Sequence, residues 1–97
     1  MDAGTKVVVT TNKDRRGVFF GTLTAHDGNG NVTLSDARNC VYWTKSTHGF
    51  LGLASLGPQD GSRVTPAVPV IEIDGVTSIT QCTDQACQRW EAEPWQN

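Results

Sequence analysis

The sequence has 97 residues, of which 37% are hydrophobic and 19% charged, and this length and composition indicate one folded domain spanning residues 1–97. The net charge of −2 excludes a protein that coats long nucleic acids through phosphate contacts alone, because that mode of binding requires clustered Lys and Arg. The apolar run at residues 7–9 is too short for a secretion signal or a membrane span, so we expect a cytoplasmic protein with no membrane partner.

The first half of the chain predicts three consecutive strands. Residues 6–11 are β-branched, and residues 18–26 end at a turn rich in glycine and asparagine. Apolar residues then alternate with polar ones, with Cys40 and Tyr42 on the same parity, so a third strand is expected over residues 31–43. We expect this strand to bend near Asp36 and Ala37.

The loop between the first two strands holds the one basic cluster, Lys13-Asp14-Arg15-Arg16. It is interpreted either as a solvated hairpin tip or as the rim of an anion site. Both interpretations stay open at the level of sequence.

Residues 44–62 predict a long loop, since the segment has four glycines and no sustained periodicity. Long ordered loops in a compact domain are often functional. This segment is therefore the first place to look for a ligand site.

The last third predicts extended chain over residues 63–73 and a helix over residues 84–93. The prolines at positions 66 and 69 place that end of the extended chain at a sheet edge or before the strand itself, because proline cannot donate a ladder hydrogen bond. The Asp74-Gly75 turn predicts that the strands on either side pair as a hairpin. Trp90 is expected to fill the core from the helix.

Three cysteines, Cys40, Cys82 and Cys87, lack the Cys-x-x-Cys spacing of zinc sites and redox motifs. Reduced, half-buried thiols are therefore expected, with no metal and no cofactor.

The segment from residue 18 to residue 37 resembles the first motif of the Sm/LSm family. The matching residues follow the spacing G-x-L-x-x-x-D-x-x-x-N-x-x-L-x-x-A and are Gly21, Leu23, Asp27, Asn31, Leu34 and Ala37. In physical terms, the glycine lets a bent strand approach its neighbour, the leucines fill a small core, and Asp27 and Asn31 hydrogen-bond across a turn. Residues 73–79 are similar in shape to the second motif of that family.

The resemblance implies a mostly β fold, namely a small five-stranded, strongly bent Sm-like barrel of the SH3 type, here with a short C-terminal helix. Asp74 stands where the family has an arginine that contacts an RNA base, so Asn31 alone carries over from the base-contacting positions. The whole chain also resembles small Sm-like proteins of tailed phages and marine metagenomes, which implies a viral setting.

An open barrel leaves unpaired strand edges, and Sm-like proteins satisfy them by joining subunits into a ring, so we expect a homo-oligomer. The first hypothesis is a non-enzymatic binder of RNA or a nucleotide. Its candidate contacts combine aromatic rings for stacking with cations for phosphate, and they are Asn31, Trp43, Lys45, Thr47, His48, Phe50 and Arg63. Each also has a plain alternative, such as core packing for the aromatics, a surface loop position for His48 and an ion pair for Arg63.

Two alternatives belong to other functional classes. A ring that sequesters a cyclic nucleotide signal needs no long basic track and agrees with the net charge, whereas a structural or scaffolding protein needs no small ligand. Catalysis is not expected, because His26 and His48 are far apart in sequence and no Gly-x-Ser-x-Gly elbow, P-loop or metal-ligand spacing is present.

Overall fold

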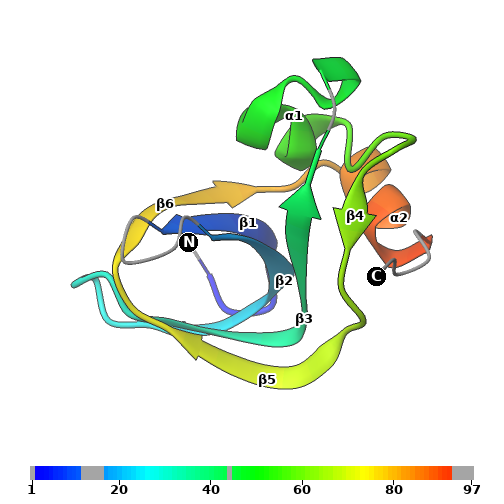
Figure 1. Cartoon of the computed structure of the whole chain (residues 1–97). Helices are drawn as coiled ribbons and strands as arrows, with labels where there is room; N and C mark the ends of the chain where they lie inside the picture. Colours follow the sequence, from blue (N-terminus) through cyan, green and yellow to red (C-terminus); the bar gives the residue numbers. More distant parts are fainter. Residues whose placement is uncertain (1, 12–16, 44, 93–97) are drawn as a thin grey trace.

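The computed structural model describes residues 2–11, 17–43 and 45–92, and these residues form a mostly β fold with two α-helices (Figure 1). In chain order the elements are β1 (Lys6–Thr11), β2 (Val18–His26), β3 (Val32–Tyr42), the 3₁₀ turn η1 (Lys45–Thr47), α1 (Gly49–Ser55), β4 (Arg63–Val64), β5 (Val68–Ile73), β6 (Val76–Gln81) and α2 (Asp84–Ala92). The three N-terminal strands and the C-terminal helix lie where the sequence predicts them.

The strands form one antiparallel sheet in the order β4-β3-β2-β1-β6, and β5 pairs with β3 beside β4 (Figure 1). The expected number of five strands is wrong, because β3 is long enough to pair with β4 near Tyr42 and with β5 over Val32–Ala37. Pro66 lies in the short break between these two partners. The sheet curves strongly, but within the described residues it is open and not a closed barrel.

The predicted hairpin of residues 70–80 is also wrong in its pairing. The Asp74-Gly75 turn forms, with φ of 67° at Gly75, yet β5 pairs with β3 and β6 pairs with β1. The turn joins β5 and β6, which lie at opposite edges of the curved sheet. Both strands thereby join the larger sheet, which stabilises them more than an isolated two-strand hairpin would.

The bend predicted near Asp36 is present, and Gly21 is the residue that allows it. Phe20 pairs with Arg38 whereas Thr22 pairs with Ser35, so β3 carries an extra residue opposite Gly21, and Asp36 takes φ of 50°. A Cβ atom at Gly21 would lie 3.0 Å from the carbonyl oxygen of Ser35. The close approach of the two backbones therefore requires glycine at this position.

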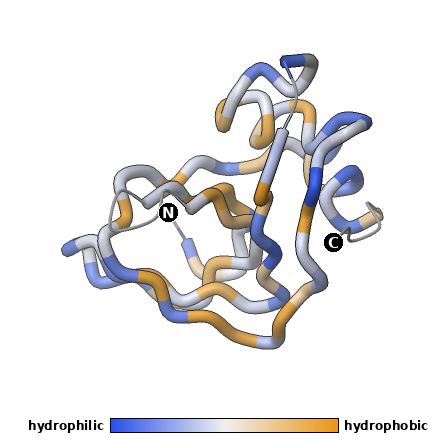
Figure 2. The backbone as a smooth tube through the Cα atoms, in the orientation of Figure 1, coloured by the Kyte–Doolittle hydropathy of each residue, from blue (hydrophilic) through white to orange (hydrophobic). Residues whose placement is uncertain are grey.

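Two apolar clusters fill the two sides of the sheet. One cluster lies inside the bend and includes Leu23 and Leu34, both fully buried. The other lies between the sheet and the helices, where Phe20 and Trp90 stack with their ring centroids 5.0 Å apart. Trp90 therefore fills the core as predicted. Figure 2 shows the contrast between the apolar strands and the hydrophilic turn that joins β2 to β3.

The long loop expected at residues 44–62 is wrong in part, because it contains η1 and α1. The sequence does not indicate the helix α1, because Gly49 and Gly52 lower the intrinsic helix propensity of this segment. Tertiary contacts stabilise the helix instead: Trp90 Nε1 donates to Leu53 O and the N–H of Thr83 donates to Ala54 O, each at 2.9 Å. Leu56 and Gly57 close the end of the helix by donating their N–H groups to Gly52 O at 2.7 and 3.1 Å.

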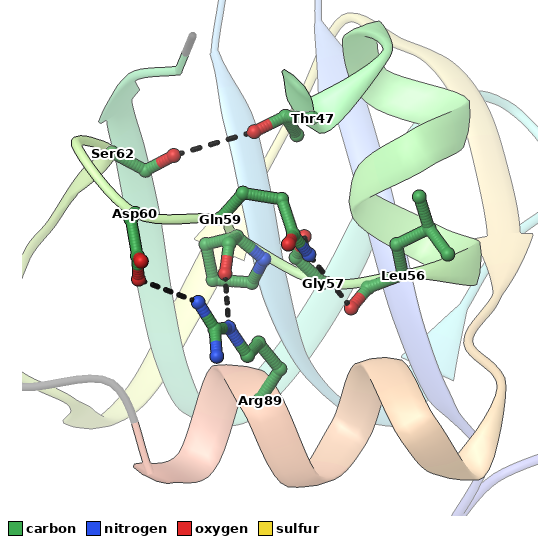
Figure 3. A network of polar contacts seen from close by, with 8 residues as sticks. Thr47, Leu56, Gly57, Gln59, Asp60, Ser62 and Arg89 are labelled. Atoms are coloured by element: carbon green, nitrogen blue, oxygen red, sulfur yellow. Dashed lines mark hydrogen bonds and ion pairs between the residues drawn. The ribbon is translucent and has the colours of Figure 1, made fainter.

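Polar contacts fix the rest of this segment to α2 (Figure 3). The guanidinium of Arg89 donates to Pro58 O at 2.7 Å and to the carboxylate of Asp60 at 2.9 Å. Gln59 Nε2 donates back to the carbonyl oxygens of Leu56 and Gly57. Residues 56–62 are thus an ordered strap between α1 and β4.

Candidate ligand-binding surfaces

Two turns far apart in sequence meet at one end of the molecule. The N–H of Val76, after the Asp74-Gly75 turn, donates to Gly30 O at 3.1 Å in the turn between β2 and β3. Beside this bond lies an open groove of about 550 Å³, whose polar lining includes Asn31, His26 and the carboxylates of Asp27, Glu72 and Asp74. The two segments that carry the Sm-like resemblance therefore border one groove, and its charge is mostly negative.

Asn31 is held in place by Asp27. Asn31 Nδ2 donates to Asp27 Oδ2 at 2.6 Å, and the backbone N–H groups of Asn29 and Asn31 donate to Asp27 Oδ1 at 2.7 and 3.2 Å. These bonds, led by the one from the Asn31 amide, hold the pKa of Asp27 below its ordinary value. With its amide nitrogen bound to Asp27, Asn31 keeps Oδ1 as its side-chain acceptor at the border of the groove.

A second surface lies where β3, η1, α1 and β4 meet, and we call Tyr42, Lys45, His48, Phe50 and Arg63 the cation–aromatic face. Tyr42 and Arg63 are cross-strand partners on β3 and β4. The N–H of His48 donates to Lys45 O at 3.1 Å, and Thr47 Oγ1 lies 3.4 Å from Ser62 Oγ, which brings η1 beside β4 (Figure 3). All five residues are exposed, Tyr42 by 53% and Phe50 by 37%.

Lys45 and Arg63, the two cations of this face, differ from the other described cations in their interaction partners. Lys6 pairs with Glu91, and Arg89 pairs with Asp60. Arg38 is buried and donates to Thr65 O at 2.8 Å and to Trp90 O. Within residues 2–11, 17–43 and 45–92, Lys45 and Arg63 form no ion pair.

The structure separates the residues that the sequence grouped as one site. Asn31 borders the groove at the β2–β3 turn, which is on the left of Figure 1. Lys45 lies on η1, His48 directly before α1, Phe50 on α1 and Arg63 on β4. Thr47 is fully buried, and Trp43 packs against the core cluster that contains Trp90. The basic cluster at residues 13–16 lies outside the described residues.

Sequence reasoning missed Tyr42 as an exposed aromatic residue. Alternation placed it on the buried side with Cys40, but the pairing shifts by one residue between Cys40↔Val64 and Tyr42↔Arg63. This bulge breaks the period of two and turns Tyr42 outward. No sequence signal marked the bulge, because its position is set by β4.

Two further features of the described residues bear on chemistry. No three side chains of His, Cys, Asp or Glu lie close enough together there to share a metal ion. Neither of the two α-helices described has the length and apolar character required to cross a membrane.

Comparison with known proteins gives a family and no activity. No curated protein matches the sequence. The model of one family, described as a domain of unknown function (DUF6948), matches residues 4–90. Because this match covers most of the 97 residues, the chain belongs to that family.

Proposed function

We propose that this chain is a non-enzymatic, ring-forming Sm-like protein that binds ligands made of bases and phosphates, single-stranded RNA first among them. The cation–aromatic face carries the proposal, because Lys45 and Arg63 have no carboxylate partner in the described structure, Arg63 pairs across the strands with the exposed Tyr42, and Phe50 on the neighbouring helix α1 is also exposed. Single-stranded nucleic acids bind where cations meet phosphates and aromatic rings stack on bases. The viral setting and the cytoplasmic location belong to the same proposal.

The open sheet supports assembly between copies. Within the described residues, β5 and β6 each pair along one edge only, with β3 and β1 respectively. Val68 and Val70 of β5 are 43% and 62% exposed, and Ile71 and Ile79 are only partly buried beside the inner core. An unpaired, apolar strand edge is a template for pairing with another chain, so joining β5 of one copy to β6 of the next would cover both edges.

Assembly would turn one weak site into a repeated one. A single face offers two cations and a few rings, which alone would bind weakly. Several copies around an axis would raise the effective concentration of the face for a strand that contacts more than one subunit. Assembly would therefore allow RNA to bind although each copy offers only two cations on this face.

Fluorescence anisotropy with labelled oligoribonucleotides tests the binding directly. We expect the double variant Lys45→Ala, Arg63→Ala to bind at least about 10-fold more weakly and to show a shallower salt dependence, since each lost phosphate contact reduces the slope by about 0.7. Tyr42→Ala should also weaken binding, by about 1–3 kcal/mol if a base stacks on the ring. Lys6→Ala removes one positive charge away from the face and should leave the affinity unchanged.

A thermal-shift measurement with cyclic dinucleotides distinguishes the two ligands that combine bases with phosphates, namely single-stranded RNA and a cyclic dinucleotide. Stabilisation by a cyclic dinucleotide without oligonucleotide binding would assign the protein to the sequestering class. If neither ligand binds, or if Lys6→Ala weakens binding as much as the double variant, the binding proposal is wrong.

A further inference from the structure

Two of the three thiols meet at the junction of β6 and α2. Cys82 follows the last residue of β6, and Cys87 is the fourth residue of α2. The N–H of Cys82 donates to Lys6 O, and the N–H of Cys87 donates to Thr83 O, each at 2.9 Å, so the backbone fixes both residues. Cys82 belongs to the core cluster between the sheet and the helices, and Cys87 packs against that cluster.

The pair has one buried and one accessible member. Cys82 is only 7% exposed, whereas Cys87 is half-buried. Both thiols line an open groove of about 490 Å³, together with Lys6, Asp84, Gln88 and Glu91. A small thiol or disulfide molecule entering this groove can reach the more exposed Cys87, and the more buried Cys82 lines the same groove.

The surroundings give the two thiols different reactivity. Burial raises the pKa of Cys82 to about 12, so this thiol stays protonated at neutral pH. Burial also raises the pKa of Cys87, but the positive charge of Lys6 acts in the opposite direction. The thiolate needed for the first attack therefore forms more readily at Cys87.

We propose that Cys82 and Cys87 form a redox-active pair that closes an intramolecular disulfide when a low-molecular-weight disulfide of the glutathione type enters the groove. The Cys87 thiolate attacks one sulfur of the oxidant, forming a mixed disulfide and releasing one glutathione thiolate. Cys82 then transfers its proton to the glutathione thiolate released in the first step and attacks the Cys87 sulfur, which releases the second glutathione as a thiolate that takes a proton from water. Two protein thiols are oxidised by two electrons in total, and one disulfide molecule is reduced to two thiols.

The closed disulfide would connect the end of β6 to the first turn of α2. Cys82 directly follows β6, whose other edge has no partner among the described residues. Cys87 lies on α2, the helix that carries Trp90. Reduction by a thiol reverses the link. The inference is independent of RNA binding and of the ring.

Mass spectrometry of trypsin-digested protein tests the pair with a built-in control. Cleavage after Arg63 and Arg89 gives a peptide of residues 64–89 that contains both cysteines, and cleavage after Arg38 and Lys45 isolates Cys40 in residues 39–45. Folded protein is treated with oxidised glutathione, then unfolded in the presence of N-ethylmaleimide, so that every remaining thiol is blocked, and digested. We expect peptide 64–89 to lose about 2 Da, to take up no maleimide, and to recover both thiols with dithiothreitol.

Two variants identify the order of attack. Cys82→Ala should retain glutathione on peptide 64–89, because no second thiol remains to release it. Cys87→Ser should stay unmodified while it is folded, because Cys82 is buried. The proposal fails if wild-type peptide 64–89 takes up two maleimides after oxidation, if it keeps glutathione without closing a disulfide, or if the disulfide joins it to the Cys40 peptide. The wild-type result decides the matter even if a variant does not fold.

Discussion

Trp90 connects three parts of the molecule through three different groups. Its ring stacks on Phe20 of β2 at an interplanar angle of 7°, and its Nε1–H donates to Leu53 O in α1 at 2.9 Å. Its own carbonyl oxygen accepts a bond from the buried Arg38 of β3. A fully buried tryptophan requires such a partner for its N–H, and here the same residue positions both helices on the sheet.

At the same scale, Asp27 and Asn31 should make the stability of the turn depend on pH. The pKa of Asp27 is lower in the folded protein than in the unfolded chain, first through the Asn31 amide and then through the Asn29 N–H. The stabilisation is therefore fully present above the unfolded pKa of about 3.9 and is lost as the pH falls through the folded value. We predict that Asp27→Asn unfolds at lower urea than the wild type at pH 7, and that this difference shrinks as the pH falls below about 4.

Asn31→Ala is the matched variant for that prediction. It should show part of the same loss at pH 7, and the double variant should lose less than the sum, because the two side chains act as a pair. A difference between Asp27→Asn and wild type that stays constant down to pH 2 would contradict the proposed role of the carboxylate.

At the scale of elements, α1 depends on a glycine in its middle. A Cβ atom at Gly52 would lie 1.6 Å from Thr47 O, whereas a Cβ at Gly49 would meet no atom within 4 Å. We predict that Gly52→Ala lowers the free energy of unfolding by at least about 3 kcal/mol, because η1 and α1 can no longer pack together. Urea denaturation followed by tryptophan fluorescence measures this change.

Gly49→Ala is the control within the same helix. Its cost comes only from the left-handed backbone, with φ of 73°, and should be about 1–2 kcal/mol. Equal losses in the two variants would show that the close contact between η1 and α1 is absent in solution.

The elements that the sequence predicts correctly are those determined by nearby residues. The positions of β1, β2, β3 and α2 follow from alternation, turn residues and the cap, and the bend follows from Gly21. The pairing of β5 and β6 with β3 and β1 depends instead on long-range contacts that no local pattern encodes. The helix α1 escapes prediction for the same reason, since packing around Gly52 outweighs its poor helix propensity.

The candidate site shows the same division. Lys45, His48, Phe50 and Arg63 lie at or near the surface as their types suggest, but Thr47 is buried and Asn31 is at the other end of the sheet. Tyr42 joins the surface only because a bulge turns it outward. Which residues share a surface is decided by the register between β3 and β4, which sequence spacing does not reveal.

At the scale of the whole molecule, the open edges of β5 and β6 determine whether copies of the chain can pair with one another. Lysine on a strand edge opposes pairing with another chain, through charge and the cost of desolvation. We predict that Val68→Lys, Val70→Lys yields a monomer that remains folded, because both valines are exposed and contribute little to the core. Val41→Lys, at an equally exposed position on β3, should leave assembly intact.

Sedimentation velocity of the wild-type protein over a range of concentrations tests the assembly most directly. Edge pairing between β5 and β6 of neighbouring copies predicts one species with a mass several times that of the 10.5 kDa chain. A single species of 10.5 kDa at every concentration would contradict it.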